Sequence, residues 1–444
     1  MPYDGDASRL RGEAMSQAAT TATTPPVLER LFGLSKSDSN VRTEFIAGLT
    51  TFLTMVYIVF VNPQILGNAG MDKGAVFVAT CIAAAVSTLV MALYANYPIA
   101  LAPGMGLNAF FAFTVVLTMK YTWQQALAAV FCSGVIFFLI SIFRIREYII
   151  NSIPKNLKFA ISAGVGLFLG IIALEESKIV VGSPATLVTL GDLHKPEAIL
   201  CLLGLVLITA LNYRRVIGGT LIGILIVTAI GIPLGLAKFT GIVSAPPSLA
   251  PTFLQLDFSR VTEASFLIVI FSFLFVDVFD NAGTLIGVTH RAGLTDADGN
   301  LPRMKQALIG TSTTTSYIES AAGVSAGGRT GLTAFFVAIF FLAALFFAPL
   351  AGMIPAYASA AALLYVACIM ARGLAEIDWD DITESAPAVV AAVTMPLTYS
   401  IATGIGLGFI TYSLGKIISG RFAEAKPAVL GLALLFALKF ALPG

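Results

Sequence analysis

Long apolar runs constrain the fold of this chain more than any other feature of its sequence. About thirteen runs of roughly 17–22 residues recur along it, each long enough to cross the hydrocarbon core of a bilayer as a helix. They lie at residues 44–62, 75–96, 100–118, 125–143, 158–174, 197–213, 216–236, 264–288, 332–350, 353–371, 386–398, 400–418 and 427–442. Because a helix satisfies its own backbone hydrogen bonds in lipid, the runs predict an all-α polytopic membrane protein.

Composition supports this fold class and excludes several functions. Only 11% of the 444 residues are charged, against about 25% in soluble domains. The net charge of +1 argues against nucleic acid as a partner. Two histidines and four scattered cysteines predict neither a metal site nor a bound cofactor. Residues 1–40 differ from the rest, being rich in Ala, Thr, Ser and Pro around Ser16–Pro26, and we expect a disordered cytoplasmic tail there.

Basic residues in short loops predict the orientation, because Lys and Arg favour the cytoplasmic side. The loops after the fourth, sixth and eighth runs carry most of them, and all fall on the same side as the N-terminus. These residues are Arg144, Arg146, Lys155, Lys158, Arg214, Arg215, Arg291, Arg303 and Lys305. The N-terminus is therefore predicted to be cytoplasmic. Glu44, close to Arg42 at the start of the first run, is expected at the membrane interface.

Two segments depart from the pattern of a plain membrane-spanning helix. Pro98–Asn108 holds two prolines and two glycines, and Thr311–Gly323 is too polar to face lipid. Irregular backbone at membrane depth occurs only where protein or a water-filled cavity covers it. A pair of interrupted segments in corresponding halves of a chain indicates a transporter binding site between inverted repeats. For the first segment alone, a helix kinked by Gly and Pro and used only for packing is the alternative.

Three ionisable residues inside apolar or interrupted segments are candidates for the site, because charge in the membrane is costly and usually functional. Asp277 and Asp280 lie three residues apart and share a helical face with Thr284. Glu319 lies in the second interrupted segment and Asn108 ends the first. Both are near expected ends of half-helices, where free backbone N–H groups can bind a ligand.

Each candidate also has a purely structural interpretation. Asp280 could cap a helix broken at Asn281–Gly283, and Asp277 could pair with a distant arginine. Glu319 could be solvated at the membrane edge, and Asn108 could hydrogen-bond between helices. The hydroxyl groups of Thr311–Ser316 could bond to one another rather than to a substrate.

The candidate side chains suit a flat, neutral heterocycle as the ligand. Carboxylates accept hydrogen bonds from ring N–H groups, while an amide both donates and accepts. Phe110, Phe111 and Phe113 follow Asn108 and could supply a stacking face. A carboxyl group in a cavity of low dielectric constant can take up a proton near neutral pH, which allows proton coupling without a metal.

Three motifs resemble the AzgA-like purine permeases, which belong to the nucleobase–cation symporter 2 (xanthine/uracil permease) group. They are Ala102–Ala109, Phe275–Thr284 and Thr313–Gly323, and the similarity extends from about Val41 to the C-terminus. The resemblance implies a transporter with fourteen segments in two inverted repeats of seven. It also implies a core domain at about 41–145 and 262–350 and a gate domain at about 155–240 and 353–442.

The same resemblance implies proton-coupled import of adenine, guanine or hypoxanthine through the bacterial inner membrane, by a protein that is not an enzyme and that can form homodimers. The substrate-binding residues that it implies are Asn108, Asp277, Asp280, Thr284, Thr315, Ser316 and Glu319. The carboxyl groups of Asp277, Asp280 and Glu319 are the candidates for carrying the proton.

The ninth segment departs from the family pattern. Between Met304 and Gly310 the chain provides only about 10 Å of helix, against a hydrocarbon core of about 30 Å. Either residues 311–326 cross the membrane alone, which inverts every later segment, or residues 304–326 form a re-entrant hairpin, which we favour. The truncation suggests a deletion variant with impaired folding or transport.

Other functions remain open at the level of sequence. A carrier of the same fold could transport uracil, xanthine or a small anion, although an anion favours a fixed positive charge and only Arg329 lies near the interrupted segments. An intramembrane protease needs a Ser–His pair or an HExxH helix, whereas His194 and His290 fall in loops. A channel would lack an occluded site and would not show saturable transport.

Overall fold

The predicted helical membrane architecture is confirmed. The structure, a computed structural model, describes residues 26–142, 152–291 and 314–441, with only the backbone described at residues 26, 141–142 and 279–291. Within these ranges eight helices are long and apolar enough to cross a bilayer, and five shorter apolar helices accompany them. Each of the predicted apolar runs coincides with one of these helices.

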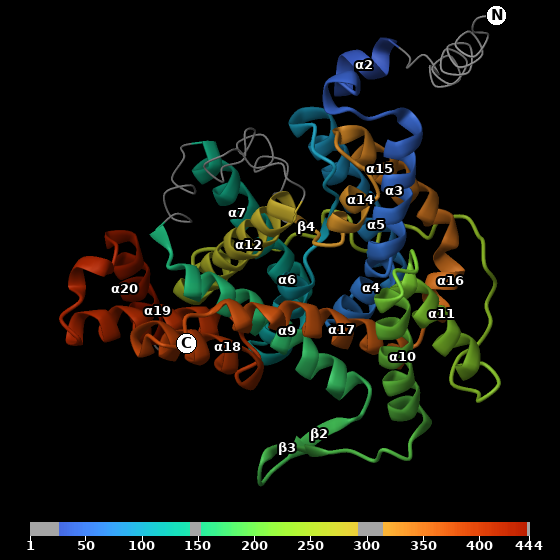
Figure 1. Cartoon of the computed structure of the whole chain (residues 1–444). Coiled ribbons are helices and arrows are strands. Elements are labelled where there is room, and N and C mark those ends of the chain that lie inside the picture. Colours follow the sequence, from blue (N-terminus) through green and yellow to red (C-terminus); the bar gives the residue numbers. More distant parts are fainter. Residues whose placement is uncertain (1–25, 143–151, 292–313, 442–444) are drawn as a thin grey trace, which may run out of the picture.

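Figure 1 colours the helices in their order along the chain, from blue at the N-terminus to red at the C-terminus. The first half contains α2 (Pro26–Phe32), α3 (Val41–Met55), α4 (Ile58–Asn68), α5 (Lys73–Val90), α6 (Met105–Ala109) with a π-helical continuation (Phe110–Thr118), α7 (Trp123–Ile142), α9 (Lys155–Glu176), α10 (Pro196–Tyr213) and α11 (Gly219–Gly231). The second half contains α12 (Ala264–Arg291), α14 (Ser320–Ser325), α15 (Gly331–Ala344), α16 (Ala348–Met353), α17 (Ala356–Ala371), α18 (Ile382–Leu397), α19 (Ile401–Ile418) and α20 (Pro427–Ala441).

Helices from the two halves of the chain pack against one another. In one group, α3 and α5 lie against α15, and α3 also contacts α14 (Figure 1). In a second group, α9 packs against α17 and α18, α18 against α19, and α10 against α11 and α17. Between the groups, α12 lies along α7 and touches α6, α9 and α19. This interleaving places segments from opposite ends of the sequence around the middle of the molecule.

The two interrupted segments meet as a short antiparallel strand pair. Strand β1 (Leu101–Pro103) pairs with β4 (Thr314–Ser316), with Ala102 opposite Thr315. The backbone N–H of Tyr317 extends the pair by donating to Ala100 O at 3.0 Å. A helix follows each strand within a few residues, α6 after β1 and α14 after β4. The first segment is thus extended backbone followed by a half-helix and not a kinked packing helix.

A second strand pair lies away from this crossing. Strands β2 (Val180–Ser183) and β3 (Leu187–Leu190) form an antiparallel hairpin between α9 and α10, and it projects from the body of the molecule in Figure 1. Its β3 residues are exposed. The hairpin therefore contributes little to the packed interior.

The expected disordered tail is shorter than predicted at its C-terminal end. Residues 1–25 lie outside the described residues, but Pro26–Phe32 form α2. Phe32 and Leu34 are buried and pack with Leu332 of α15. These apolar side chains, placed after the Ala/Thr/Pro-rich stretch, bury enough surface to hold the segment against α15.

Glu44, which was expected at the membrane interface, has a side chain that is fully buried inside the protein. Its Oε1 accepts hydrogen bonds from Ser39 Oγ at 2.7 Å and from the backbone N–H of Arg329 at 3.1 Å. Its Oε2 accepts from the backbone N–H groups of Thr330 at 3.4 Å and Thr333 at 3.1 Å, and from the Thr333 hydroxyl. One carboxylate therefore satisfies three of the backbone N–H groups where α15 begins, and ties that helix to α3.

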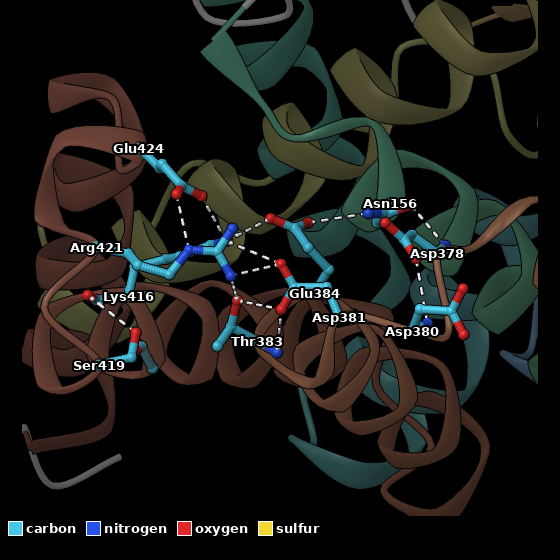
Figure 2. A network of polar contacts seen from close by, with 11 residues as sticks. Asn156, Asp378, Asp380, Asp381, Thr383, Glu384, Lys416, Ser419, Arg421 and Glu424 are labelled. Atoms are coloured by element: carbon cyan, nitrogen blue, oxygen red, sulfur yellow. Dashed lines mark hydrogen bonds and ion pairs between the residues drawn. The ribbon is translucent and has the colours of Figure 1, made fainter.

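A network of charges ties together the ends of three helices in the second group (Figure 2). The side chain of Lys416 on α19 is fully buried, and its Nζ lies 2.8 Å from carboxylate oxygens of both Glu384 and Glu424. Asn156 on α9 donates to Glu384 Oε2 at 3.0 Å. Because a buried ammonium group is stable only with such partners, the network fixes α9, α18 and α19 relative to one another.

The predicted ninth segment at residues 304–310 lies outside the described residues. The same holds for Arg303, which directly precedes this segment.

Candidate substrate site

A cavity of about 90 Å³ lies among α4, α6, α7 and α12. Its lining is mostly apolar with three polar side chains, and consists of Leu66, Leu107, Asn108, Phe111, Leu127, Val130, Ser133, Phe273 and Asp277. Pockets for drug-sized ligands measure roughly 300–1,000 Å³, so in this conformation only a small ligand fits. An apolar cavity with a few convergent polar groups is the arrangement that small-molecule sites share.

Two of the predicted site residues, Asn108 and Asp277, line this cavity together. Asn108 comes from the half-helix that follows β1, and Asp277 comes from α12, where it is 3% exposed. Residues far apart in the sequence thus place an amide and a carboxylate on one small space. Ser133 on α7 adds a buried hydroxyl group that the sequence analysis did not identify.

Aromatic rings form part of the cavity wall, although not as predicted for all three phenylalanines. Phe111 lines the cavity, as does Phe273, which the sequence analysis missed. Phe110 packs edge-on against Phe273 with ring centroids 5.0 Å apart. Phe113 instead contacts the ring of Tyr399, 6.4 Å away. The side chains of Phe111 and Phe273 are therefore the rings available to a flat ligand.

Asn108 also makes the interhelical hydrogen bond that was its structural alternative. Its Nδ2 donates to Asn62 Oδ1 on α4 at 2.6 Å. Asn62 Nδ2 in turn donates to Thr80 Oγ1 on α5 at 2.7 Å. Asn62 and Thr80 are 3% and 1% exposed. The sequence analysis missed both, although a polar amide near the end of the first apolar run was a usable signal.

Glu319 is half-buried and has a specific partner, so it is not a freely solvated residue at the membrane edge. Its Oε1 accepts a hydrogen bond of 2.6 Å from the hydroxyl group of Tyr57. Tyr57 is 1% exposed and lies where α3 gives way to α4. Glu319 directly precedes α14 and does not line the 90 Å³ cavity. It therefore occupies a second polar position beside the strand crossing.

Thr315 and Ser316 are buried in β4, where their backbone pairs with β1. The neighbouring Thr314 has a buried hydroxyl oxygen that finds no hydrogen-bond partner in the structure as described. Neither Thr315 nor Ser316 lines the cavity next to Asn108. Residues 311–313 of the predicted hydroxyl ladder lie outside the described residues.

The remaining candidates, Asp280 and Thr284, lie on α12, but their side chains fall outside the described residues. The backbone of α12 continues as one helix from Ala264 to Arg291. The alternative in which Asp280 caps a helix broken at Asn281–Gly283 is therefore wrong, because no break occurs there.

The sequence matches the family described as Permease family, the xanthine/uracil permeases, over residues 42–407. The chain belongs to this family. The resemblance drawn from the three motifs is confirmed, and with it the assignment of the protein as a multi-pass membrane transporter and not an enzyme.

Curated relatives match this permease over almost its full length. It is 49% identical to the adenine permease AdeP of Escherichia coli, with 96% of this chain and 98% of AdeP covered. It is 50% identical to a putative permease of Methanocaldococcus jannaschii, covering 93% and 98% of the two chains. The guanine/hypoxanthine permease PbuG of Bacillus subtilis is 44% identical, with 93% and 99% covered.

Solved structures share the fold of the permease at low sequence identity. The transmembrane domain of a cyanobacterial bicarbonate transporter, BicA, matches with a TM-score of 0.61 and 15% identity, covering 83% of this chain and 97% of that one. The murine anion transporter Slc26a9, in its inward-facing state, matches with a TM-score of 0.60 and 12% identity, covering 90% and 73%. At these identities the likeness concerns the fold alone.

Proposed function

We propose that this permease imports the purine nucleobases adenine, guanine and hypoxanthine through the bacterial inner membrane by proton symport. One observation carries the proposal, namely that Asn108 and Asp277 share a small buried cavity with the rings of Phe111 and Phe273. An amide and a carboxylate complement the N–H groups and ring nitrogens of a base, and the rings complement its faces. The names of the relatives AdeP and PbuG support the same class of substrate.

The rest of the predicted site is proposed to close around the base during transport. Thr315, Ser316 and Glu319 lie on or directly after β4, the strand that pairs with the segment leading to Asn108. Asp280 and Thr284 follow Asp277 on the same helix, α12. Movement of the half-helices at the strand crossing would bring these groups and the 90 Å³ cavity into one larger site.

Proton coupling is proposed to use one of the carboxyl groups of Asp277, Asp280 or Glu319. Glu319 has the arrangement that such a role requires, because it is partly buried and accepts a hydrogen bond from Tyr57. Protonation would turn one carboxylate oxygen from an acceptor into a donor and so change that contact. A change of partner on protonation can favour one conformation of the carrier over the other.

The division into core and gate is proposed from the packing of the helices. The proposed core includes α3, α5, α14 and α15, and the proposed gate includes α9, α10, α17, α18 and α19, each set having its own mutual contacts. We further propose that the core moves against the gate, that the N-terminus is cytoplasmic, and that the gate domains form any homodimer.

Uptake of radiolabelled purines tests the proposal most directly. Cells that lack their own purine permeases and express this chain should accumulate adenine, guanine or hypoxanthine with saturation. Unlabelled purines should compete, and a protonophore should abolish accumulation. Saturable uptake that persists with the protonophore but needs sodium would refute proton coupling. Uptake of uracil or xanthine but not of adenine, guanine or hypoxanthine would refute the proposed substrates.

A small anion is a less suitable cargo for this site. Among the described residues that line the cavity none is cationic, and one, Asp277, is acidic. An ionised carboxylate in a space of low dielectric constant repels an anion strongly. Bicarbonate uptake measured in the same cells should therefore not exceed that of cells without the permease.

A further inference from the structure

A row of hydrogen bonds leads from the cavity to the backbone of α5. Asn108 Nδ2 donates to Asn62 Oδ1 at 2.6 Å, and Asn62 Nδ2 donates to Thr80 Oγ1 at 2.7 Å. Thr80 Oγ1 then donates to the backbone oxygen of Val76 at 2.7 Å. Only Asn108 lines the cavity, so Asn62 and Thr80 can reach a ligand only through it.

We infer that Asn62 and Thr80 are positioning residues that hold the Asn108 amide with its carbonyl oxygen toward the cavity, so that the site selects a substrate N–H at that point. The inference rests on the proposed function for the identity of the substrate, but not for the orientation of the amide. It assigns a role in specificity to two residues that never touch the substrate.

The backbone oxygen of Val76 determines which group donates and which accepts in every hydrogen bond of the row. A carbonyl oxygen can only accept, so the single hydroxyl hydrogen of Thr80 is used there. The oxygen of Thr80 can then only accept from its other neighbour, and Asn62 must present its NH₂ group. The Oδ1 of Asn62 consequently faces Asn108, which must present its own NH₂ group in turn.

Burial makes this direction hard to reverse. Asn62 and Thr80 are 3% and 1% exposed, so no solvent competes for their hydrogen bonds. If the amide of Asn108 turned over, its oxygen would face the oxygen of Asn62, and two buried acceptors would repel each other. Oxygen and nitrogen of an amide have nearly the same size, so only the row of hydrogen bonds decides which of them faces the ligand.

The result is an amide oxygen that faces a mostly apolar cavity as an acceptor. Asn108 Oδ1 has no hydrogen-bond partner among the described residues, and the carboxyl group of Asp277 lies on the same cavity. An amide oxygen and a carboxyl group on one cavity match a ligand that carries N–H donors, such as a ring N–H and an exocyclic amino group. Sites that offer hydrogen bonds to a donor reject analogues that lack it by large factors, because the buried acceptor is left unpaired.

Replacement of Thr80 tests the inference. Thr80→Val keeps the shape of the side chain but removes the hydroxyl group, so that the amides of Asn62 and Asn108 are free to turn over. Thr80→Ser keeps the hydroxyl group and should restore the wild-type behaviour. Thr228→Val is a matched control, since Thr228 is also 1% exposed and donates to the backbone oxygen four residues earlier, at 2.8 Å, but it is not part of the row of hydrogen bonds that leads to Asn108.

The measurement is competition for labelled-purine uptake by purines methylated at single ring nitrogens. In the wild type, the analogue that blocks the critical N–H should compete at least about tenfold more weakly than its parent base. Thr80→Val should reduce this ratio about tenfold while the maximal rate changes less than about twofold, and Thr80→Ser and Thr228→Val should keep the wild-type ratio. An unchanged ratio in Thr80→Val, or an equal loss in Thr228→Val, would overturn the inference.

A second measurement keeps the test independent of transport. In the purified permease labelled with ¹⁵N-asparagine, the NH₂ signals of Asn62 and Asn108, assigned with Asn62→Leu and Asn108→Ala, should exchange slowly with solvent. In Thr80→Val both should exchange faster, and in Thr80→Ser neither should. Absence of any purine uptake by the wild type would refute the proposed function, whereas unaltered exchange in Thr80→Val would refute the orientation of the amide.

Discussion

The buried carboxylate of Glu44 offers the most direct test of how this structure is held together. The change Glu44→Gln keeps the shape of the side chain but replaces one acceptor oxygen by an NH₂ group. The new side-chain amide can take two orientations, and the less destabilising one places its NH₂ group at the position of Oε1. There Ser39 can rotate its hydroxyl group so that its oxygen accepts from this NH₂ group. The backbone N–H of Arg329 cannot rotate, so it is left facing a donor.

The hydrogen bonds of Glu44 allow the loss of unfolding free energy in Glu44→Gln to be worked out. One unsatisfied buried N–H costs about 1–3 kcal/mol. The hydrogen bonds from Thr330 and Thr333 remain, but they lose the strengthening that a charged acceptor provides, which is roughly half of their strength. The sum is about 2–4 kcal/mol of unfolding free energy, and Glu44→Ala, which removes every acceptor at this position, should cost more.

Thermal unfolding of the purified permease in detergent, followed by intrinsic fluorescence, measures the effect. For a chain of this length the entropy of unfolding corresponds to about 1 °C per kcal/mol, so Glu44→Gln should lower Tm by about 2–4 °C. Glu376→Gln is the matched control, because Glu376 is exposed and makes no hydrogen bond or ion pair in the described part of the chain. A Tm for Glu44→Gln equal to that of the control would refute the argument.

Further predictions concern the proposed site and the fold around it. Asp277→Asn and Glu319→Gln should each abolish purine accumulation without reducing the amount of protein in the membrane, and normal uptake in either variant would remove that residue from the site. Tyr57→Phe, which removes the donor to Glu319 Oε1, should shift the pH dependence of uptake, and an unshifted profile would separate this contact from proton coupling. Hydrogen bonds from Thr383 and Arg421 lower the pKa of Asp381 in the folded protein. The ionised Asp381 therefore stabilises the fold above the unfolded-state pKa of about 3.9, and this stabilisation is lost as the pH falls below that value. Unfolding measured between pH 6 and 3 should therefore depend less on pH in Asp381→Asn, and identical profiles would refute this. Insertion of a helix-length apolar segment after residue 308 should raise purine uptake if the ninth segment is truncated, and unchanged uptake would contradict the deletion hypothesis.

The site was only partly predictable from the sequence. Asp277 and Asn108 were identifiable because a polar or charged side chain inside an apolar run is rare and costly. Asn62 and Thr80 were not, because an amide or hydroxyl group in an apolar run has many possible partners on neighbouring helices. Their role depends on α4 lying between α5 and α6 in space, and nothing in the local sequence states that arrangement.

Glu44 shows the same limit for the fold. Its position near Arg42 at the start of an apolar run was typical of an interfacial residue. The structure instead buries it against the N-terminus of α15, whose first residues lie more than 280 positions later in the chain. An interfacial and a buried glutamate look alike in the sequence, because only the partner segment distinguishes them.

The sequence by itself determined the membrane-spanning helices, the two interrupted segments and the family. These depend on the length and polarity of short stretches, which the thickness of a bilayer and the cost of exposed backbone constrain directly. The tertiary structure alone decided that β1 pairs with β4, that Asn108 and Asp277 share a cavity, and that Glu44 anchors α15. Those contacts join segments about 170 to 290 residues apart, and their energies exist only once the helices between them have packed.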